Sequence, residues 1–193
     1  MRKWKRVETA EGPRFRSSLA AHEASLLANL VTSLVSMLDD RESSAPTDEL
    51  QTITGIKTGN SRRPQDATMA RLLPDFYRTG RTHPAGSANA ESLNAALRSL
   101  HEPAIIDAKR VAAERLLSTM PQGGGRFELT EDDANAWTSA VNDVRLALGT
   151  MLGVGPDGPE RLPDNHPLTG HLDVYQWLTV MQEYLVLALM GKR

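Results

Sequence analysis

The chain has 193 residues, a formal net charge of −2 and no cysteine. That length suits one compact domain with a sizeable core, and the missing cysteines exclude disulfides, thiolate nucleophiles and cysteine-bound metals. The small net charge gives no overall field that would attract nucleic acid. Because the first residues are charged and no run of about 18 apolar residues occurs, we expect a cytoplasmic protein without a membrane span.

Residues 1–17 are predicted to form a short β-hairpin. Trp4–Thr9 and Arg14–Ser17 fit two strands, and the chain turns between them through a three-residue loop, Ala10-Glu11-Gly12. A loop of that length would place Val7 opposite Phe15, which is a favourable cross-strand pair. The chain is therefore expected to begin with a small antiparallel sheet.

The hairpin concentrates positive charge. Residues 1–81 hold 13 Lys and Arg against 10 Asp and Glu, whereas residues 82–193 hold 9 against 14, so we expect a basic edge on an acidic body. The predicted register puts Arg6 opposite Arg16, which is unfavourable unless Glu8 or an external anion lies between them. An acidic protein surface or a DNA backbone would suit this edge. The expected partner-binding residues are Arg2, Lys3, Lys5, Arg6, Arg14 and Arg16.

The rest of the chain predicts a helical body over residues 18–193. Ser18 can cap its first helix, and Thr130 with the three acids that follow can cap a later one. Apolar residues recur at three- and four-residue spacing along the expected helices. The expected long helices are Leu19–Leu38, Pro103–Thr119, the helix from Thr130 to Met151, and Asp173–Met190. The expected shorter elements are helices at Asp48–Ile53, Ala67–Leu73 and Ser92–His101 and a brief strand at Phe127–Leu129.

These elements predict a mostly α fold, a helical bundle of about four long helices with a small N-terminal β-hairpin. We expect a single domain over residues 1–193. A loop at about 78–90 has the Gly, Pro, Ser and Thr content of a disordered segment. The last helix is apolar almost all round at its end, which burial in the bundle and a homodimer interface explain equally well.

The dipeptide Glu102-Pro103 predicts a break between two helices. The residue before a proline avoids the helical region, and a proline suits the first position of a new helix. In the helix that precedes the break, four apolar residues share one face and are expected to point inward. They are Leu93, Ala96, Leu97 and Leu100.

No motif in the sequence indicates catalysis. The segment Gly55–Gly59 lacks the first glycine of a phosphate-binding loop, and no apolar strand precedes it. The neighbouring acids Asp39-Asp40 and Asp132-Asp133 point in different directions on a helix, so they do not form an acid and base pair. No helix carries a row of Arg, Asn and Gln that would read a DNA groove. We therefore expect no enzyme activity and no cofactor.

One group of residues keeps a metal site or an enzyme open as an alternative. His166 and His171 lie five residues apart with Asp164 and Asp173 beside them, and imidazole and carboxylate groups suit several divalent ions. The other interpretation, which we favour, is that these residues fill polar loop and cap positions. The sequence therefore predicts no metal site.

Motifs along most of the chain carry a family resemblance. They are Arg2–Thr9, Gly12–Leu19, Ile53–Gly59, Leu72–Arg78, Asn94–Val111, Glu128–Gly149 and Val174–Gly191. Through them the chain resembles an actinobacterial, chiefly mycobacterial, family of AosR-like oxidative stress regulators, long labelled as of unknown function and often encoded beside the protease adaptor ClpS. The resemblance implies a cytoplasmic regulator that responds to oxidation and acts on transcription with a stress sigma factor.

The resemblance also implies a sensor made of a Cys-x-x-x-Cys pair near the N-terminus. In this chain Lys5 and Thr9 stand at those positions, and no cysteine occurs elsewhere. Direct thiol sensing by this chain is therefore excluded. Two functions remain as hypotheses: a non-enzymatic stress regulator that contacts a sigma factor or the DNA backbone, and an adaptor or structural protein of the ClpS/Clp proteolysis system.

Overall fold

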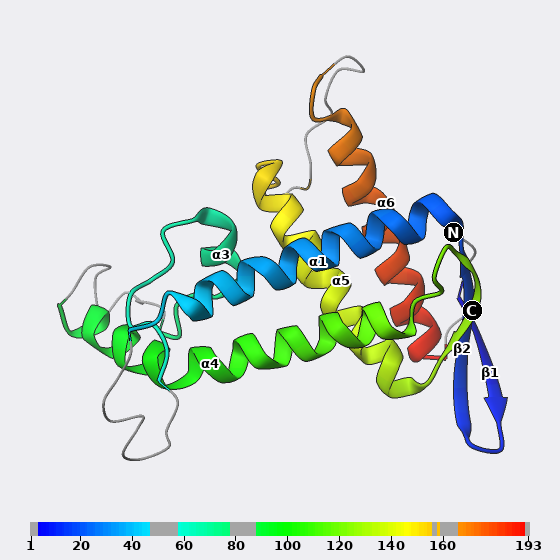
Figure 1. Ribbon diagram of the computed structural model, residues 1–193, viewed down its shortest axis with the longest axis horizontal. Coiled ribbons are helices and arrows are strands. Elements are labelled where there is room, and N and C mark those ends of the chain that lie inside the picture. The colour runs from blue at the N-terminus through cyan, green and yellow to red at the C-terminus, as the bar shows by residue number, and fades with distance from the viewer. Residues whose placement is uncertain (1–3, 47–57, 78–87, 156–157, 159–165, 192–193) are drawn as a thin grey trace. The chain divides into compact units, whose positions relative to one another are not determined.

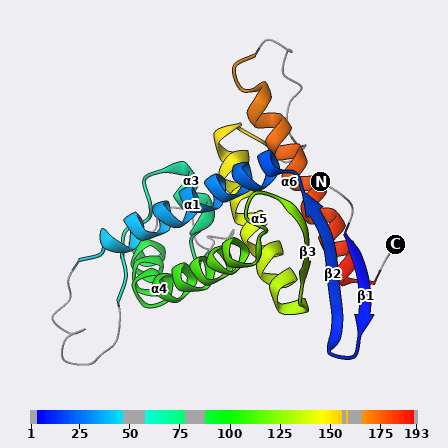
Figure 2. The same ribbon diagram turned by 45° about the vertical axis from the view of Figure 1, so that its right-hand side comes forward.

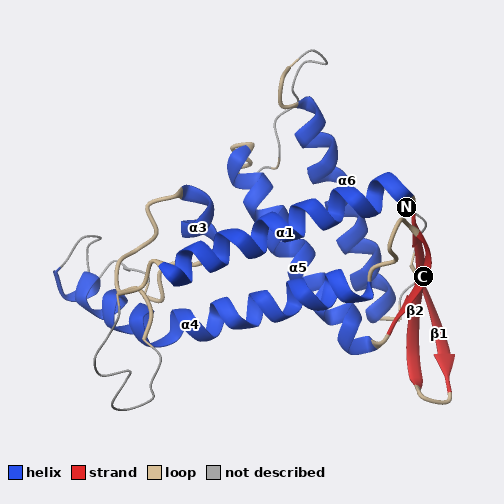
Figure 3. Ribbon diagram, in the orientation of Figure 1, coloured by secondary structure: helices blue, strands red, loops and turns tan. Residues whose placement is uncertain are grey.

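The computed structural model describes residues 4–46, 58–77, 88–155, 158 and 166–191. These residues form five α-helices and one three-stranded antiparallel sheet (Figures 1 and 3). In chain order the elements are β1 (Lys5–Thr9), β2 (Gly12–Leu19), α1 (Ala21–Ser43), α3 (Ala67–Leu72), α4 (Ala88–Thr119), β3 (Gly125–Leu129), α5 (Glu131–Met151) and α6 (Thr169–Leu189). The predicted mostly α fold with an N-terminal hairpin is confirmed. The predicted helix Asp48–Ile53 and most of the predicted loop at about 78–90 lie outside the described residues.

The chain divides into two compact units. The sheet unit combines Met1–Val35 with Lys109–Arg193, and the central unit is Ser36–Ala108. The boundaries between these units fall inside α1 and α4. A single domain over residues 1–193 stays a prediction.

The hairpin register differs by one residue from the predicted one. Arg6, not Val7, lies opposite Phe15, and Val7 lies opposite Arg14. The turn contains only two residues, because Gly12 pairs with Thr9 and so belongs to β2. Gly12 has φ of 104°, a left-handed conformation that glycine adopts readily. Since side chains alternate along a strand, the shift moves every β1 side chain to the opposite face of the sheet.

The third strand, β3, extends the hairpin into a sheet with the order β1-β2-β3 (Figure 2). The predicted brief strand at Phe127–Leu129 is therefore confirmed within Gly125–Leu129. Ser18 does not cap a helix, because Ser18 and Leu19 continue β2 and pair with Arg126 and Gly125. The α1 helix begins two residues later, at Ala21.

Aromatic rings fill the core beneath this sheet. Trp4 packs edge-on against Phe127 and Trp137, with ring centroids 5.4 Å and 5.7 Å away, and Phe127 stacks on Trp137 at 5.1 Å. Trp137 is fully buried, and its Nε1 donates a hydrogen bond of 2.8 Å to Thr119 Oγ1. Such edge-on and offset ring pairs stabilise a core beyond the area they bury. This cluster holds the start of the chain against α5.

Helices α5 and α6 pack against each other in the sheet unit. The predicted apolar seam of α5 is buried from Ala134 to Leu148, although Met151 at its end is exposed. In α6, Leu178, Met181 and Leu185 are fully buried. The predicted homodimer through this helix stays a prediction.

The predicted cap of α5 is present as a capping box. Thr130 Oγ1 accepts a hydrogen bond from the Asp133 amide, while Asp133 Oδ2 accepts from the Thr130 amide at 3.0 Å. Arg115 adds a hydrogen bond of 2.6 Å to Asp133 Oδ1. Burial by itself would raise the pKa of Asp133, but the hydrogen bonds from Thr130 and Arg115 outweigh it, so this pKa lies below its ordinary value.

Replacing Asp133 with alanine is expected to lower the free energy of unfolding by about 1–2 kcal/mol at neutral pH, because the substitution removes the carboxylate of the capping box and its hydrogen bond from Arg115. A carboxylate whose pKa is lowered by folding stabilises the protein above its ordinary pKa. The difference between wild type and Asp133→Ala should therefore shrink as the pH falls below about 4. Urea unfolding of both proteins across that range checks this; a difference that stays constant with pH would contradict the ionised cap.

In the central unit, α4 runs without a break through Pro103, so the predicted boundary at Glu102-Pro103 is wrong. A proline inside a helix leaves the carbonyl four residues earlier without its N–H partner. That carbonyl belongs to Ser99, and it accepts a hydrogen bond of 2.8 Å from the amide of Gly59. A loop distant in sequence thus replaces the bond that Pro103 cannot make.

A buried ionic cluster lies next to the hydrogen bond between Gly59 and Ser99. Glu102 and Arg98 are each 1% exposed, and Arg98 NH1 donates to Glu102 Oε2 at 2.9 Å. Arg41, at the end of α1, donates through Nε to Glu102 Oε1 at 2.7 Å. Arg98 also donates to Asp75 at 2.7 Å and to the carbonyl of Leu73 at 3.1 Å. The cluster therefore ties α1, α4 and the segment after α3 together within the central unit.

This cluster reverses the predicted inward face of the early part of α4. Leu93 is 43% exposed and Leu100 is 55% exposed, Ala96 is also exposed, and Leu97 is half-buried. The buried positions are instead Ala90, Arg98, Glu102, Pro103 and Ile106. The apolar pattern was misleading here because an ion-paired arginine and glutamate occupy the inward face.

Candidate functional site

The structure separates the expected partner-binding residues into two groups. Arg2 and Lys3 lie outside the described residues. Because side chains alternate along paired strands, Lys5, Arg14 and Arg16 share the face of the sheet that points away from Phe15. Arg6 lies on the opposite face, with Phe15. The sequence predicted one cluster of cations, but the register of the hairpin places them on two opposite faces of the sheet.

Arg6 is bound to its own chain. Its Nε donates to Glu8 Oε1 at 2.7 Å, and its NH1 donates to the carbonyl of Leu189 at 3.1 Å. Its guanidinium also lies 6.0 Å from the centre of the buried Phe15 ring. Arg6 therefore links the hairpin to the end of α6. The predicted contact between Arg6 and Arg16 does not occur, because Lys5 is the residue opposite Arg16.

The other face carries two arginines that share one carboxylate. Glu128 of β3 contacts Arg14 Nε at 3.7 Å and accepts a hydrogen bond from Arg16 Nε. Arg14 also pairs with Glu11 in the turn at 2.7 Å. Exposed ion pairs of this kind stabilise a fold by less than about 1 kcal/mol, but they restrict the directions in which the guanidinium groups point.

The third strand supplies a cation that sequence reasoning missed. Arg126 is exposed and lies two residues before Glu128, so alternation places it on the same face as Arg16. We call this face the basic sheet face; its charged residues are Lys5, Arg14, Arg16, Arg126 and Glu128, with Glu11 at the adjoining turn. Four cations against two carboxylates leave a net charge of +2. The predicted strand at Phe127–Leu129 was the signal that could have revealed Arg126.

Trp4 and Phe15, the two rings of the hairpin, are buried, so neither can stack on a nucleotide base. Lys5 and Thr9, at the ends of β1, lie about 13 Å apart because a strand rises about 3.3 Å per residue. A disulfide needs Cα atoms within about 7 Å. A cysteine pair at these two positions could therefore not close while β1 keeps its extended conformation.

The metal alternative gains no support from the residues that the structure describes. No group of three or more His, Asp and Glu side chains in the described ranges could hold a metal ion. His166 Nδ1 accepts a hydrogen bond of 3.2 Å from the amide of Leu168, just before α6 begins. This contact fits the interpretation of His166 as a loop and cap residue. Asp164 lies outside the described residues.

None of the described helices combines the length and the apolar character that crossing a bilayer requires.

No solved structure matches the chain. Among proteins of known sequence, the oxidative stress regulators AosR of Mycobacterium tuberculosis strain H37Rv and of Mycobacterium bovis are each 67% identical to it over 196 residues, which cover 100% of this chain and 90% of each relative. The family model for the domain of unknown function DUF2017 matches residues 1–189. The chain therefore belongs to the DUF2017 family, as a member closely similar to the mycobacterial AosR proteins.

Proposed function

We propose that this protein is a non-enzymatic stress regulator that binds an acidic protein partner through its basic sheet face. The relatives that are 67% identical are named oxidative stress regulators, which supports the regulatory role. The net positive charge of the face supports the docking mode. A stress sigma factor or another part of the transcription machinery is the partner class that we propose. Because the chain has no cysteine, the stress signal reaches it by a route other than its own thiols.

The arrangement of charges on the face favours a protein over a DNA backbone. Glu128 lies between Arg14 and Arg16 and would approach any phosphate that both arginines contacted. DNA offers only negative charge along its backbone, whereas a protein surface can offer acids to the arginines and a donor to Glu128. Electrostatic complementarity of this mixed kind gives specificity and fast association.

Two cations of the face are the most available for a partner. Among the described residues, Lys5 and Arg126 make no ion pair with the chain's own acids and are both exposed. Arg14 and Arg16 are already oriented by Glu128, so less side-chain entropy is lost when they meet a second acid. Lys5 and Arg126 therefore provide charge that can be altered with little effect on folding.

Reversing both free cations, in Lys5→Glu with Arg126→Glu, is expected to weaken partner binding at least about tenfold, because each reversal replaces attraction with repulsion. Glu128→Gln should strengthen binding, because it removes one negative charge from the face while the amide Oε1 can still accept hydrogen bonds. Affinity capture from stressed and unstressed cells, scored for sigma factors and RNA polymerase against Clp components, measures both effects. The loss should grow smaller at high salt.

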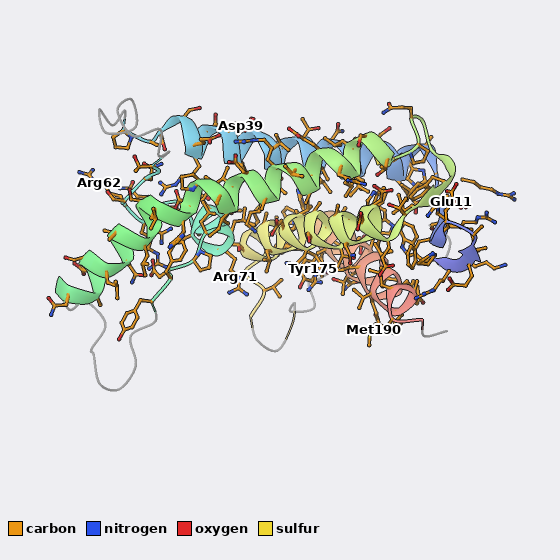
Figure 4. The ribbon with its side chains drawn as sticks, turned by 90° about the horizontal axis from the view of Figure 1, so that it is seen from below. Glu11, Asp39, Arg62, Arg71, Tyr175 and Met190 are labelled. Carbon is orange, nitrogen blue, oxygen red and sulfur yellow. The ribbon has the colours of Figure 1, made fainter. Side chains whose placement is uncertain are left out.

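A matched control tests whether position or net charge matters. Arg62 and Arg71 are exposed arginines of the central unit (Figure 4), and reversing both changes the net charge by the same amount. Capture by Arg62→Glu with Arg71→Glu should equal that of wild type. Equal losses in the two double variants, or no loss in Lys5→Glu with Arg126→Glu, would overturn the proposed face. Recovery of Clp components without transcription proteins would favour the adaptor hypothesis instead.

A further inference from the structure

Strand β1 forms one edge of the sheet. It pairs with β2 on one side, and Figure 2 shows it as the strand farthest from β3. In the described residues, no backbone hydrogen bond joins the other side of Lys5–Thr9 to any segment. The pairing with β2 is continuous from Lys5 to Thr9, so no bulge interrupts the strand, and it contains no proline. Bulges and prolines are two devices that protect edge strands from further pairing.

The register identifies which backbone groups point outward. In an antiparallel pair, residues alternate between positions that exchange two hydrogen bonds and positions that exchange none. Glu8 lies opposite Pro13, which has no N–H, so this pair is of the second kind, as is Arg6 opposite Phe15 two residues along. Phe15 in turn pairs with Leu129 on its other side. The N–H and C=O groups of Arg6 and Glu8 are therefore directed away from β2.

We propose that two copies of the chain pair through β1, antiparallel and about a two-fold axis at Val7. In this register Arg6 faces the partner's Glu8 and Glu8 faces the partner's Arg6, so the outward backbone groups of these residues bond each other. Val7 faces the partner's Val7, and Lys5 faces the partner's Thr9. Each contact is repeated by the symmetry, as a two-fold interface requires. Opposite charges directly across a pair of strands are favourable.

Other registers with the same backbone directions are disfavoured by charge. A shift by two residues in one direction sets Arg6 against the partner's Arg6, and a shift in the other direction sets Glu8 against the partner's Glu8. Parallel pairing in register produces both like-charge contacts. Like charges directly opposite each other destabilise a sheet. Shifts by one residue fail because the amides of Lys5, Val7 and Thr9 are used by β2. The sequence KRVET therefore selects one register.

The pairing is expected to be weak and dependent on concentration. A five-residue strand buries less area than the interface of a stable complex requires. The product is a continuous six-stranded sheet, in which the two basic sheet faces lie side by side. Self-association is a property of the purified chain, so its test is independent of the proposed partner.

Two single charge reversals and their mixture test the proposal. In Arg6→Glu both positions 6 and 8 are acidic, and in Glu8→Arg both are basic, so each variant alone repels its own copies. Mixed in equal amounts, they restore opposite charges at both pairs. Analytical ultracentrifugation from about 10 μM to about 1 mM should show an association constant at least about tenfold lower for each variant than for wild type. The mixture should regain the wild-type value.

A second pair of variants tests the backbone contact. Glu8→Ala and Glu8→Pro both lack the carboxylate, but only the proline removes the outward N–H while leaving the bonds to β2. Glu8→Ala should therefore still associate, and Glu8→Pro should not, with thermal unfolding confirming that both are folded. If Glu8→Pro does not fold, the charge-reversal mixture decides the matter. A wild type that stays monomeric over the whole concentration range would overturn the proposal, and a strand of another protein would then be the remaining occupant of the edge. Single charge reversals that associate as strongly as wild type would also overturn it.

Discussion

Replacing Glu102 with alanine is expected to lower the free energy of unfolding by about 3–5 kcal/mol, because breaking a buried ion pair leaves an uncompensated charge. Arg98 is 1% exposed and cannot reach water when Glu102 is removed. Arg41 would lose both of its hydrogen bonds to the carboxylate, at 2.7 Å and 3.2 Å. Asp75 would be left as the one carboxylate that pairs with Arg98 among the described residues. Guanidinium unfolding followed by circular dichroism measures the change.

The exposed carboxylate Glu128 provides the control for this prediction. It also lies between two arginines, but its side chain and that of Arg16 remain in contact with solvent. Glu128→Ala should change the free energy of unfolding by less than about 1 kcal/mol. The two substitutions remove the same chemical group, so burial is the main difference between them. If Glu102→Ala lowers the free energy of unfolding as little as Glu128→Ala does, the central cluster is solvated and contributes little to stability.

Replacing Gly59 with alanine is the second large expected effect, a loss of about 2–4 kcal/mol from steric crowding and an unpaired carbonyl. A Cβ on Gly59 would lie 2.9 Å from both Cδ and Cγ of Pro103, which is closer than such atoms approach. Moving the loop away would break the hydrogen bond from Gly59 to the Ser99 carbonyl. Pro103 cannot replace this bond, since it has no N–H. Chemical denaturation of Gly59→Ala measures the loss.

A double-mutant cycle separates this mechanism from general loop damage. Pro103→Ala removes the ring that would clash and restores an amide that can bond Ser99 within α4. The combined variant Gly59→Ala with Pro103→Ala should therefore be more stable than the sum of the two single changes predicts. Gly170→Ala is the matched control, because nothing lies within 4 Å of a Cβ built there. If the changes in unfolding free energy of the two single variants simply add in the double variant, the proposed coupling between Gly59 and Pro103 is wrong.

The two proposals place different functions on different parts of one small sheet. The basic sheet face carries Lys5 and Arg126 as its most available cations, while the outer edge of β1 directs the backbone groups of Arg6 and Glu8 away from β2. Pairing at the edge would double the positive charge that a partner meets. A partner with two acidic segments would then bind more tightly to the dimer, because the second contact becomes intramolecular. Variants at Arg6 and Glu8 alter the outer edge of β1, whereas variants at Lys5 and Arg126 alter the basic sheet face. The two proposals can therefore be tested separately.

Features set by neighbours in the chain could be predicted from the sequence alone. Helical spacing of apolar residues located α1, α5 and α6, and Thr130 with Asp133 identified the start of α5. The basic N-terminal hairpin was recognised from its composition. The lack of cysteine excluded a thiol sensor without any structure. These inferences succeeded because the interactions behind them span a few residues and depend little on the rest of the fold.

Only the tertiary structure decided the features that depend on distant partners. Continuity of α4 through Pro103 requires the amide of Gly59, and the burial of Arg98 requires Glu102, Asp75 and the loop carbonyls around them. The hairpin register depends on whether Gly12 joins the turn or the strand, a difference of one residue that no composition records. The face of the sheet likewise includes Arg126, which β3 brings from more than a hundred residues away. The sequence alone thus determined the elements and the charge of this protein, whereas long-range hydrogen bonds and ion pairs decided which side chains are buried and which face a partner.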